Sequence, residues 1–170
     1  MEELNQEPKS VTRCHIVALP FRGRGLINPM MNFCTHLAHK LGDSIKITFV
    51  VTEEWLGILE STPMPPQILL RSFRNVIPSE FSKSLTLDFE SFLEIVVAKL
   101  EAPFEAVLNT SEPASCIITD FYLTWAYPIG NKRNIPVVTF WTTSSFVFFV
   151  LCHADLLTKN GHSLANISGT

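Results

Sequence analysis

The sequence predicts an α/β fold in which a Rossmann-like parallel sheet carries helices on both of its faces. Two observations lead to this prediction. Five short, nearly continuous apolar runs have the length of buried strands, and helical segments separate them along the chain. Strands that alternate with helices in this way form parallel sheets through right-handed crossovers. A chain of 170 residues is long enough for one such domain.

The first unit is a strand, a glycine-rich turn and a helix. Residues 14–20 (CHIVALP) form a short apolar run, which the segment FRGRGL follows. Asn28 and Pro29 then offer a capping side chain and a residue suited to the first helical turn. Apolar side chains recur at helical spacing up to Leu41, and Gly42 supplies a stop. We therefore expect the helix to begin at Asn28.

The elements beyond the first helix are expected to alternate in the same way. In chain order they are a strand (45–52), a short helix (54–59), a strand (67–73), a polar loop (74–84), a long amphipathic helix (89–108), a strand (115–119), a short helix (123–132), a strand (136–141) and a helix (144–157). Pro103 is expected to kink the long helix, and Pro128 to disturb the short one.

Composition and charge exclude several classes of function. The net charge of -3 leaves no basic face for nucleic acid. Residues 134–154 carry no charge over the length of a membrane span, but Pro136 and several hydroxyl side chains favour a buried strand and helix instead. Residues 1–12 form a polar leader without the apolar region of a secretory signal, so we expect a cytoplasmic protein. The four cysteines have no metal-ligand spacing, so we expect free thiols and no metal.

Ligands of such sheets bind beyond the carboxyl ends of the strands, which here means residues 21–28, 120–125 and 141–146. Asp120 follows the fourth strand and is either a helix N-cap or part of a reactive site. Gly23 and Gly25 either permit a tight turn or let a phosphate approach the helix N-terminus. Thr142 and Thr143 follow the fifth strand and either cap the next helix or contact a ligand. Phe21, Tyr122 and Phe146 are either core residues or the lining of a pocket.

Three segments in register carry a resemblance to a known family. ALPFRGRGLINPM after the first strand, ITDFYLTWA after the fourth and NIPVVTFWTTSSF around the fifth resemble plant family-1 UDP-glycosyltransferases, from about residue 13 to the end. That family has the two-domain GT-B fold. The resemblance implies that residues 13–170 are an incomplete N-terminal, acceptor-binding domain, and that the C-terminal donor-binding domain is absent from this sequence.

The resemblance also implies a reaction and a set of site residues. Members of the family transfer a sugar from a UDP-sugar, here expected to be UDP-glucose, to a small lipophilic acceptor by an inverting displacement that needs no metal. A histidine in the first turn removes the proton of the acceptor hydroxyl, and an aspartate stabilises that histidine. The aspartate corresponds to Asp120. The expected donor contacts are Gly25, Thr142 and Thr143, and the expected acceptor contacts are Phe21, Tyr122 and Phe146.

This chain departs from the family at the residue that should be the base. Leu26 stands at the histidine position and cannot accept a proton. By strand and helix rise, His15 lies roughly 17 Å from the ligand end of the sheet and His36 roughly 12 Å along the first helix, and no other histidine is a convincing substitute. We therefore expect no sugar transfer by this chain alone. The alternatives are a non-catalytic binding or regulatory module and a non-functional truncated product.

Overall fold

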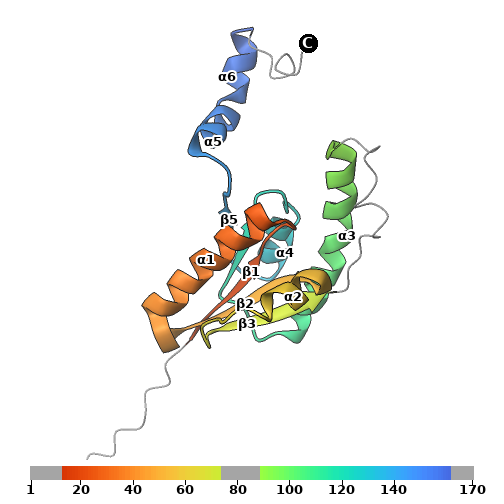
Figure 1. Cartoon of the computed structure of the whole chain (residues 1–170). Helices are drawn as coiled ribbons and strands as arrows, with labels where there is room; N and C mark the ends of the chain where they lie inside the picture. Colours follow the sequence, from red (N-terminus) through yellow and green to blue (C-terminus); the bar gives the residue numbers. More distant parts are fainter. Residues whose placement is uncertain (1–12, 74–88, 162–170) are drawn as a thin grey trace, which may run out of the picture. The chain divides into compact units, whose positions relative to one another are not determined.

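The computed structural model describes residues 13–73 and 89–161, and of residues 89–96 the backbone alone. Its centre is a five-stranded sheet in the order β3-β2-β1-β4-β5, with every neighbouring pair parallel (Figure 1). The strands are β1 (Cys14–Leu19), β2 (Ile45–Thr52), β3 (Ile68–Phe73), β4 (Cys116–Asp120) and β5 (Val137–Phe140). The predicted α/β class and parallel sheet are confirmed.

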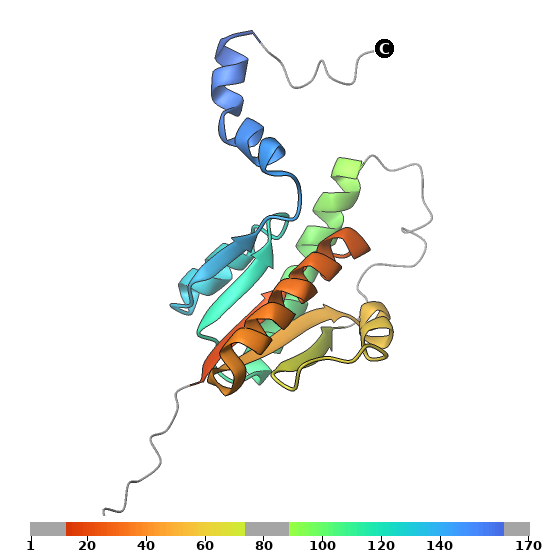
Figure 2. The ribbon, with the colours of Figure 1, turned by 60° about the vertical axis from the view of Figure 1, so that its left-hand side comes forward.

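Helices separate the strands, as the alternating pattern predicts, and two more follow the last strand. They are α1 (Arg24–Leu41), the 3-10 turn η1 (Gly42–Ser44), α2 (Glu53–Leu59), α3 (Phe89–Thr110), α4 (Ala126–Lys132), α5 (Ser145–Cys152) and α6 (Ala154–Lys159). Figure 2 shows α1 running along one face of the sheet. The predicted polar loop at residues 74–84 lies outside the described residues, as does the polar leader.

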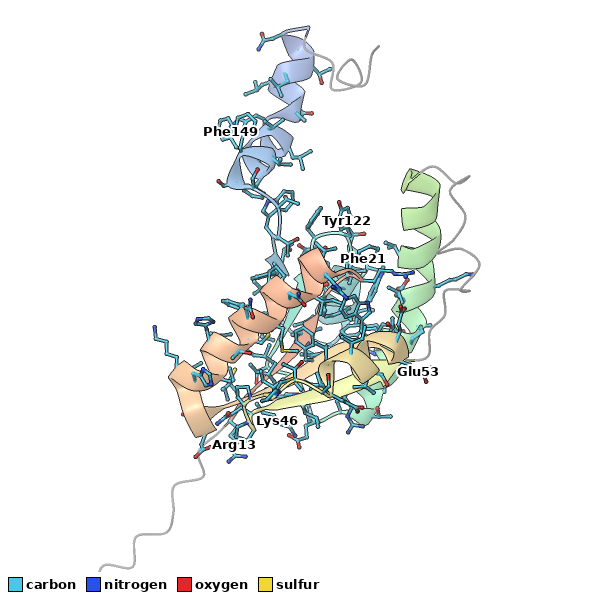
Figure 3. All side chains as sticks on the ribbon, in the orientation of Figure 1. Arg13, Phe21, Lys46, Glu53, Tyr122 and Phe149 are labelled. Atoms are coloured by element: carbon cyan, nitrogen blue, oxygen red, sulfur yellow. The ribbon has the colours of Figure 1, made fainter. Side chains whose placement is uncertain are left out.

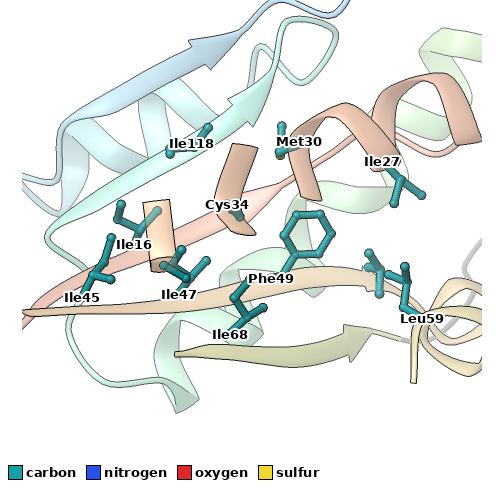
Figure 4. Packing of buried hydrophobic residues seen from close by; sticks show 13 residues of the cluster. Ile16, Ile27, Met30, Cys34, Ile45, Ile47, Phe49, Leu59, Ile68 and Ile118 are labelled. Atoms are coloured by element: carbon teal, nitrogen blue, oxygen red, sulfur yellow. The ribbon is translucent and has the colours of Figure 1, made fainter. Parts of the chain in front are cut away.

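Each face of the sheet has its own apolar core because side chains alternate along every strand. On one face, α1 and α2 pack on β1, β2 and β4; Figure 4 shows this cluster, with Met30 and Cys34 of α1 above Ile47 and Phe49 of β2. On the other face, α3 and α4 pack against the alternate residues of the same strands. There the fully buried ring of Phe104 lies 5.4 Å from that of Trp125, measured between centroids. Helices therefore cover both faces, as predicted.

Three helix predictions differ clearly from the structure. The short helix expected over residues 123–132 begins at Ala126 as α4, after a turn in which the N–H of Leu123 bonds to the carbonyl of Asp120 at 3.0 Å. The helix expected to begin at Asn28 begins at Arg24, because Gly23 adopts a φ of 128° and its carbonyl accepts hydrogen bonds from the N–H groups of Leu26 and Ile27. Pro29 therefore lies inside α1 rather than at its start. The single helix expected over residues 144–157 is two helices, α5 and α6, which meet at His153.

The chain divides into two compact units, Met1–Phe140 and Trp141–Thr170. The first contains the whole sheet with α1 to α4, and the second contains α5 and α6. None of the helices in the described ranges has the length and apolarity needed to cross a bilayer.

Candidate functional site

The segments that leave β1 and β4 lie side by side at one end of the sheet. The two strands are adjacent and parallel, with Leu19 opposite Thr119. Phe21 and Tyr122, which follow these strands, bring their ring centroids to 5.4 Å (Figure 3). Phe21 is buried and Tyr122 packs against the same apolar cluster. The structure thus joins two of the three predicted acceptor contacts, while their role as a pocket wall stays a prediction.

The turn after β1 places Gly25 and Leu26 in the first turn of α1. Gly23 is the glycine that the backbone requires, since its φ of 128° is rare for residues with a side chain. Gly25 is helical and nothing lies within 4 Å of the position that a Cβ would take, so its surroundings are open. Leu26 packs, partly buried, against the cluster that contains Phe21 and Trp125. An apolar side chain is therefore accommodated at the position where the family resemblance implies a base.

Asp120 is a fully buried carboxylate at the end of β4. Its Oδ1 accepts a hydrogen bond of 3.1 Å from the backbone N–H of Tyr122, and its Oδ2 has no partner among the described residues. Burial raises the pKa of Asp120 to about 6, although the Tyr122 N–H acts in the opposite direction. Asp120 does not cap α4, because that helix begins six residues later at Ala126. The capping alternative is therefore wrong.

Asp120→Asn is expected to remove a pH dependence from the stability of the protein. The pKa of Asp120 in the folded state, about 6, lies above the ordinary value of 3.8 for an aspartate, so the folded state holds this proton more tightly than the unfolded state. The resulting stabilisation is complete below about pH 4 and is lost as pH rises through 6, by up to about 3 kcal/mol. Denaturant unfolding of both proteins between pH 4 and 7.5 should show their difference in unfolding free energy changing by that amount. A difference that is constant with pH would contradict the buried charge.

Two histidines of the first unit have hydrogen-bond partners away from the position of the missing base. His15 is buried at the amino end of β1, where Nδ1 donates to the carbonyls of Glu112 and Pro113 at 3.1 and 3.2 Å. Its Nε2 then accepts from the hydroxyl of Thr48 at 2.8 Å. His36 is bonded to the carbonyl of Asn32 on its own helix. Each of these rings is occupied away from the carboxyl ends of the strands, as the sequence predicts; His162 lies outside the described residues.

His15→Leu is expected to destabilise the protein by about 1–3 kcal/mol, because it leaves the buried Thr48 hydroxyl and two carbonyls without their partner. His36→Leu, at an exposed ring, is the control and should change stability by less than about 0.5 kcal/mol. Chemical unfolding of the three proteins measures both effects. Equal midpoints for His15→Leu and the unsubstituted protein would show that the bonds of His15 contribute nothing net.

The hollows of the first unit lie at both ends of the sheet. At the carboxyl end, an apolar hollow of about 10 Å³ has little more room than one water needs. It is lined by Pro20, Arg22, Ile27, Val51, Thr52, Trp55, Phe73 and Leu100. A groove of about 490 Å³ lies at the amino end, lined by charged residues that include Arg13 and Lys46, which Figure 3 shows far from Phe21 and Tyr122. The carboxyl end is the better candidate despite its smaller hollow, since ligands of parallel α/β sheets bind there.

The apolar hollow contains residues that the sequence interpretation did not single out. Thr52 and Phe73 are the last residues of β2 and β3, and Trp55 lies in α2. Ligands of parallel sheets bind beyond the carboxyl ends of the strands, and this rule applies equally to Thr52 and Phe73. The predicted site covered only the strand ends that carry one of the three motif segments. Nothing in the sequence near Trp55 indicates that its ring reaches this end of the sheet.

The remaining predicted site residues belong to the second unit. Ser144 caps α5 by accepting a hydrogen bond of 3.3 Å from the N–H of Val147, so the capping alternative for Thr142 and Thr143 is wrong. The hydroxyl of Thr142 is buried and has no partner within the described part of the chain. Phe146 lies in α5. Donor contacts by the threonines and an acceptor contact by Phe146 stay predictions. Across the described ranges, no group of three or more His, Cys, Asp or Glu side chains could hold a metal.

Comparison with known proteins gives relatives of one kind. UDP-glycosyltransferase 87A2 of Arabidopsis thaliana is 44% identical over 162 residues, which are 94% of this chain and 35% of the relative. The chain therefore spans about a third of the length of the curated relatives it matches. No protein-family model matches the sequence.

Solved structures share the fold at low sequence identity. TcCGT1 in complex with UDP has a TM-score of 0.71 at 17% identity, covering 86% of this chain and 32% of the other. Phytolacca americana UGT2, complexed with UDP-2fluoro-glucose and pterostilbene, has a TM-score of 0.66 at 18% identity, covering 86% and 35%. The sheet and its helices thus correspond to an incomplete N-terminal domain of such proteins.

Proposed function

Because the chain belongs to the plant UDP-glycosyltransferase family and spans the N-terminal third of its members, we propose that it is the acceptor-side part of a sugar-transferring enzyme. The complete form moves a sugar, with UDP-glucose as the donor we favour, to a hydroxyl of a small lipophilic molecule. The observation that carries this proposal is the identity of 44% along 94% of the chain. The pairing of Phe21 with Tyr122 beside the buried Asp120 supports it.

The proposed roles follow the geometry at the carboxyl ends of β1 and β4. The apolar hollow and the Phe21–Tyr122 pair form one side of the acceptor site, which must widen to admit a ligand because the hollow is only about 10 Å³. Asp120 keeps the carboxylate that would stabilise a neighbouring base. Leu26 supplies no base, so transfer to neutral alcohols is slow. As donor contacts we propose Gly25 in the first unit, where the space around a Cβ is open, and separately Thr142 and Thr143 in the second unit.

The donor half lies, in this proposal, outside the 170 residues. An antibody raised against residues 13–73 detects the endogenous protein, and we expect a species well above the mass of this chain. That species, purified, is then assayed for UDP release from UDP-glucose with a panel of phenolic and terpenoid acceptors. Acceptor-dependent UDP release supports the proposal. A large species with no turnover on any acceptor or UDP-sugar opposes it.

A second candidate is a non-catalytic module that binds small lipophiles or regulates an intact relative. Leu26 at the base position favours it, as does a stable endogenous species of only 170 residues if one is found. A ligand that binds only the folded state stabilises it by about 2.7 kcal/mol at a concentration of 100 times its Kd. The melting temperature of the protein therefore rises. No rise across aromatic and terpenoid ligands removes the support for this candidate. We place either form in the cytoplasm, in keeping with four free cysteines.

A further inference from the structure

A polar hollow lies on the α3 side of the sheet, toward the amino end. Its volume is about 150 Å³, roughly ten times what one water needs. Lys46, which Figure 3 shows far from Phe21 and Tyr122, forms one wall. The other polar walls include His15 of β1, Thr48 of β2, Arg71 of β3, and Ser111 and Glu112 beyond α3. None of the predicted acceptor or donor contacts lines this hollow, so it is separate from the site described above.

The floor of the hollow is buried, and its polar groups bond to one another. His15 is 5% exposed and Thr48 is 2% exposed. The hydroxyl of Thr48 donates to Nε2 of His15 at 2.8 Å, and Nδ1 of the same ring donates to two backbone carbonyls. This bonding uses the neutral form of the ring. The charge of the hollow therefore comes from the side chains around its mouth.

Two cations and one carboxylate lie around the mouth. Nζ of Lys46 donates to Oε1 of Glu112 at 2.6 Å, and this hydrogen bond lowers the pKa of Glu112, so these two charges offset each other. Arg71 is exposed and has no hydrogen bond or ion pair with any residue in the described ranges. A neighbouring groove shares Lys46 and adds the opposite charges of Arg13 and Asp43. The excess charge of this region is therefore positive, in a chain whose net charge is -3.

The donors that remain decide the class of ligand. The guanidinium of Arg71 presents N–H groups in a planar fork that matches two oxygens of a carboxylate or a phosphate. Lys46 has three N–H donors and uses one of them on Glu112. The hydroxyl of Ser111 donates to the carbonyl of Val107 at 2.7 Å, so toward a ligand it acts as an acceptor for an O–H group. We propose that the hollow binds a small oxyanion, a carboxylate or a phosphate, with Arg71 as its main partner and Lys46 as its second.

The proposal is independent of sugar transfer, so its test needs no enzyme activity. The full chain is melted in rising concentrations of sodium phosphate or of sodium succinate, with sodium chloride keeping the ionic strength constant. An anion that binds the folded state raises the melting temperature along a saturating curve, from which its Kd follows. We expect such a curve for at least one of the two anions, and the lower Kd identifies phosphate or carboxylate as the better ligand.

Two variants make the test specific to the hollow. Arg71→Gln should raise the Kd by about tenfold or more, which corresponds to the loss of a hydrogen bond to a charged group. Arg71→Lys keeps the charge but loses the fork, so its Kd should lie between those of the unsubstituted protein and Arg71→Gln. Lys40→Gln is the matched control, because it removes the same charge from the exposed last turn of α1, and it should leave the Kd unchanged.

Three results would overturn the proposal. Phosphate also stabilises proteins by exclusion from their surface, and that effect does not depend on one arginine. Equal curves for the unsubstituted protein and Arg71→Gln would therefore show that no site is formed at Arg71. An equal loss in Lys40→Gln would mean that only the overall charge matters, and the absence of a rise with either anion would mean that neither binds. Far-UV circular dichroism confirms that each variant is folded, as expected for substitutions of exposed side chains.

Discussion

Replacing Leu26 by His in the complete protein is expected to raise kcat/KM for an alcohol acceptor by roughly 10²- to 10⁴-fold, the contribution of a positioned general base. The physical reason is that a leucine cannot take the hydroxyl proton, whereas imidazole titrates near neutral pH. Asp120 lies buried at the end of β4 with one oxygen unpaired within the described residues, and in the proposed function it is the carboxylate that stabilises the protonated form of the new imidazole. Steady-state kinetics with UDP-glucose measures the gain.

Two further variants make this test specific. Leu26→Gln introduces a polar side chain of similar length that is not a base, and it should give no comparable gain. Asp120→Asn in the Leu26→His background should remove much of the gain, because the imidazolium then lacks its carboxylate. The same kcat/KM for leucine and histidine at position 26 would show that this residue does not act as the base. An acidic phenol should gain less than an alcohol, since its proton is lost more easily.

Gly130→Ala is expected to destabilise the fold by about 3 kcal/mol or more. This is at or above the upper end of the range of free energies that extra side-chain groups cost in a well-packed core. A Cβ on Gly130 would overlap Cγ2 of Val137 and would lie 2.8 Å from the carbonyl oxygen of Ile135. Neither neighbour moves easily: Val137 is β-branched and opens β5, and the Ile135 N–H is bonded back to the Gly130 carbonyl at 2.9 Å. Either β5 or α4 must therefore shift.

The matched control is Gly57→Ala in α2. Nothing lies within 4 Å of the Cβ position there, and the residue is helical, so alanine should stabilise by roughly 0.5–1 kcal/mol. Urea denaturation of the two variants measures both effects, and opposite signs are expected. A neutral Gly130→Ala would mean that β5 is not held as closely to α4 as its contacts indicate. Val137→Ala in the Gly130→Ala background should recover only part of the loss, since the Ile135 carbonyl remains.

The sequence determined the elements whose signal is local. Apolar runs of five to eight residues bounded by turn residues indicated the buried strands, so the bounds of β2 agree with the prediction and those of β1 and β4 differ by one residue. Gly42 ends α1 as predicted, since a glycine there costs no side-chain clash. The parallel order of the sheet followed from the alternation of strands and helices. Three short motifs, read in register, also led to the family.

Tertiary structure decided what depends on residues far apart in the chain. One local feature was also decided by the structure alone: α1 begins at Arg24 because the carbonyl of Gly23 accepts hydrogen bonds from the N–H groups of the first turn. The unpaired oxygen of Asp120 and its raised pKa arise from burial by several elements at once. The bonds of His15 to Thr48 and to the carbonyl of Glu112 link positions 33 and 97 residues away. Strand register likewise set Ile16 opposite Cys116, because only pairing between strands sets which distant residues are neighbours.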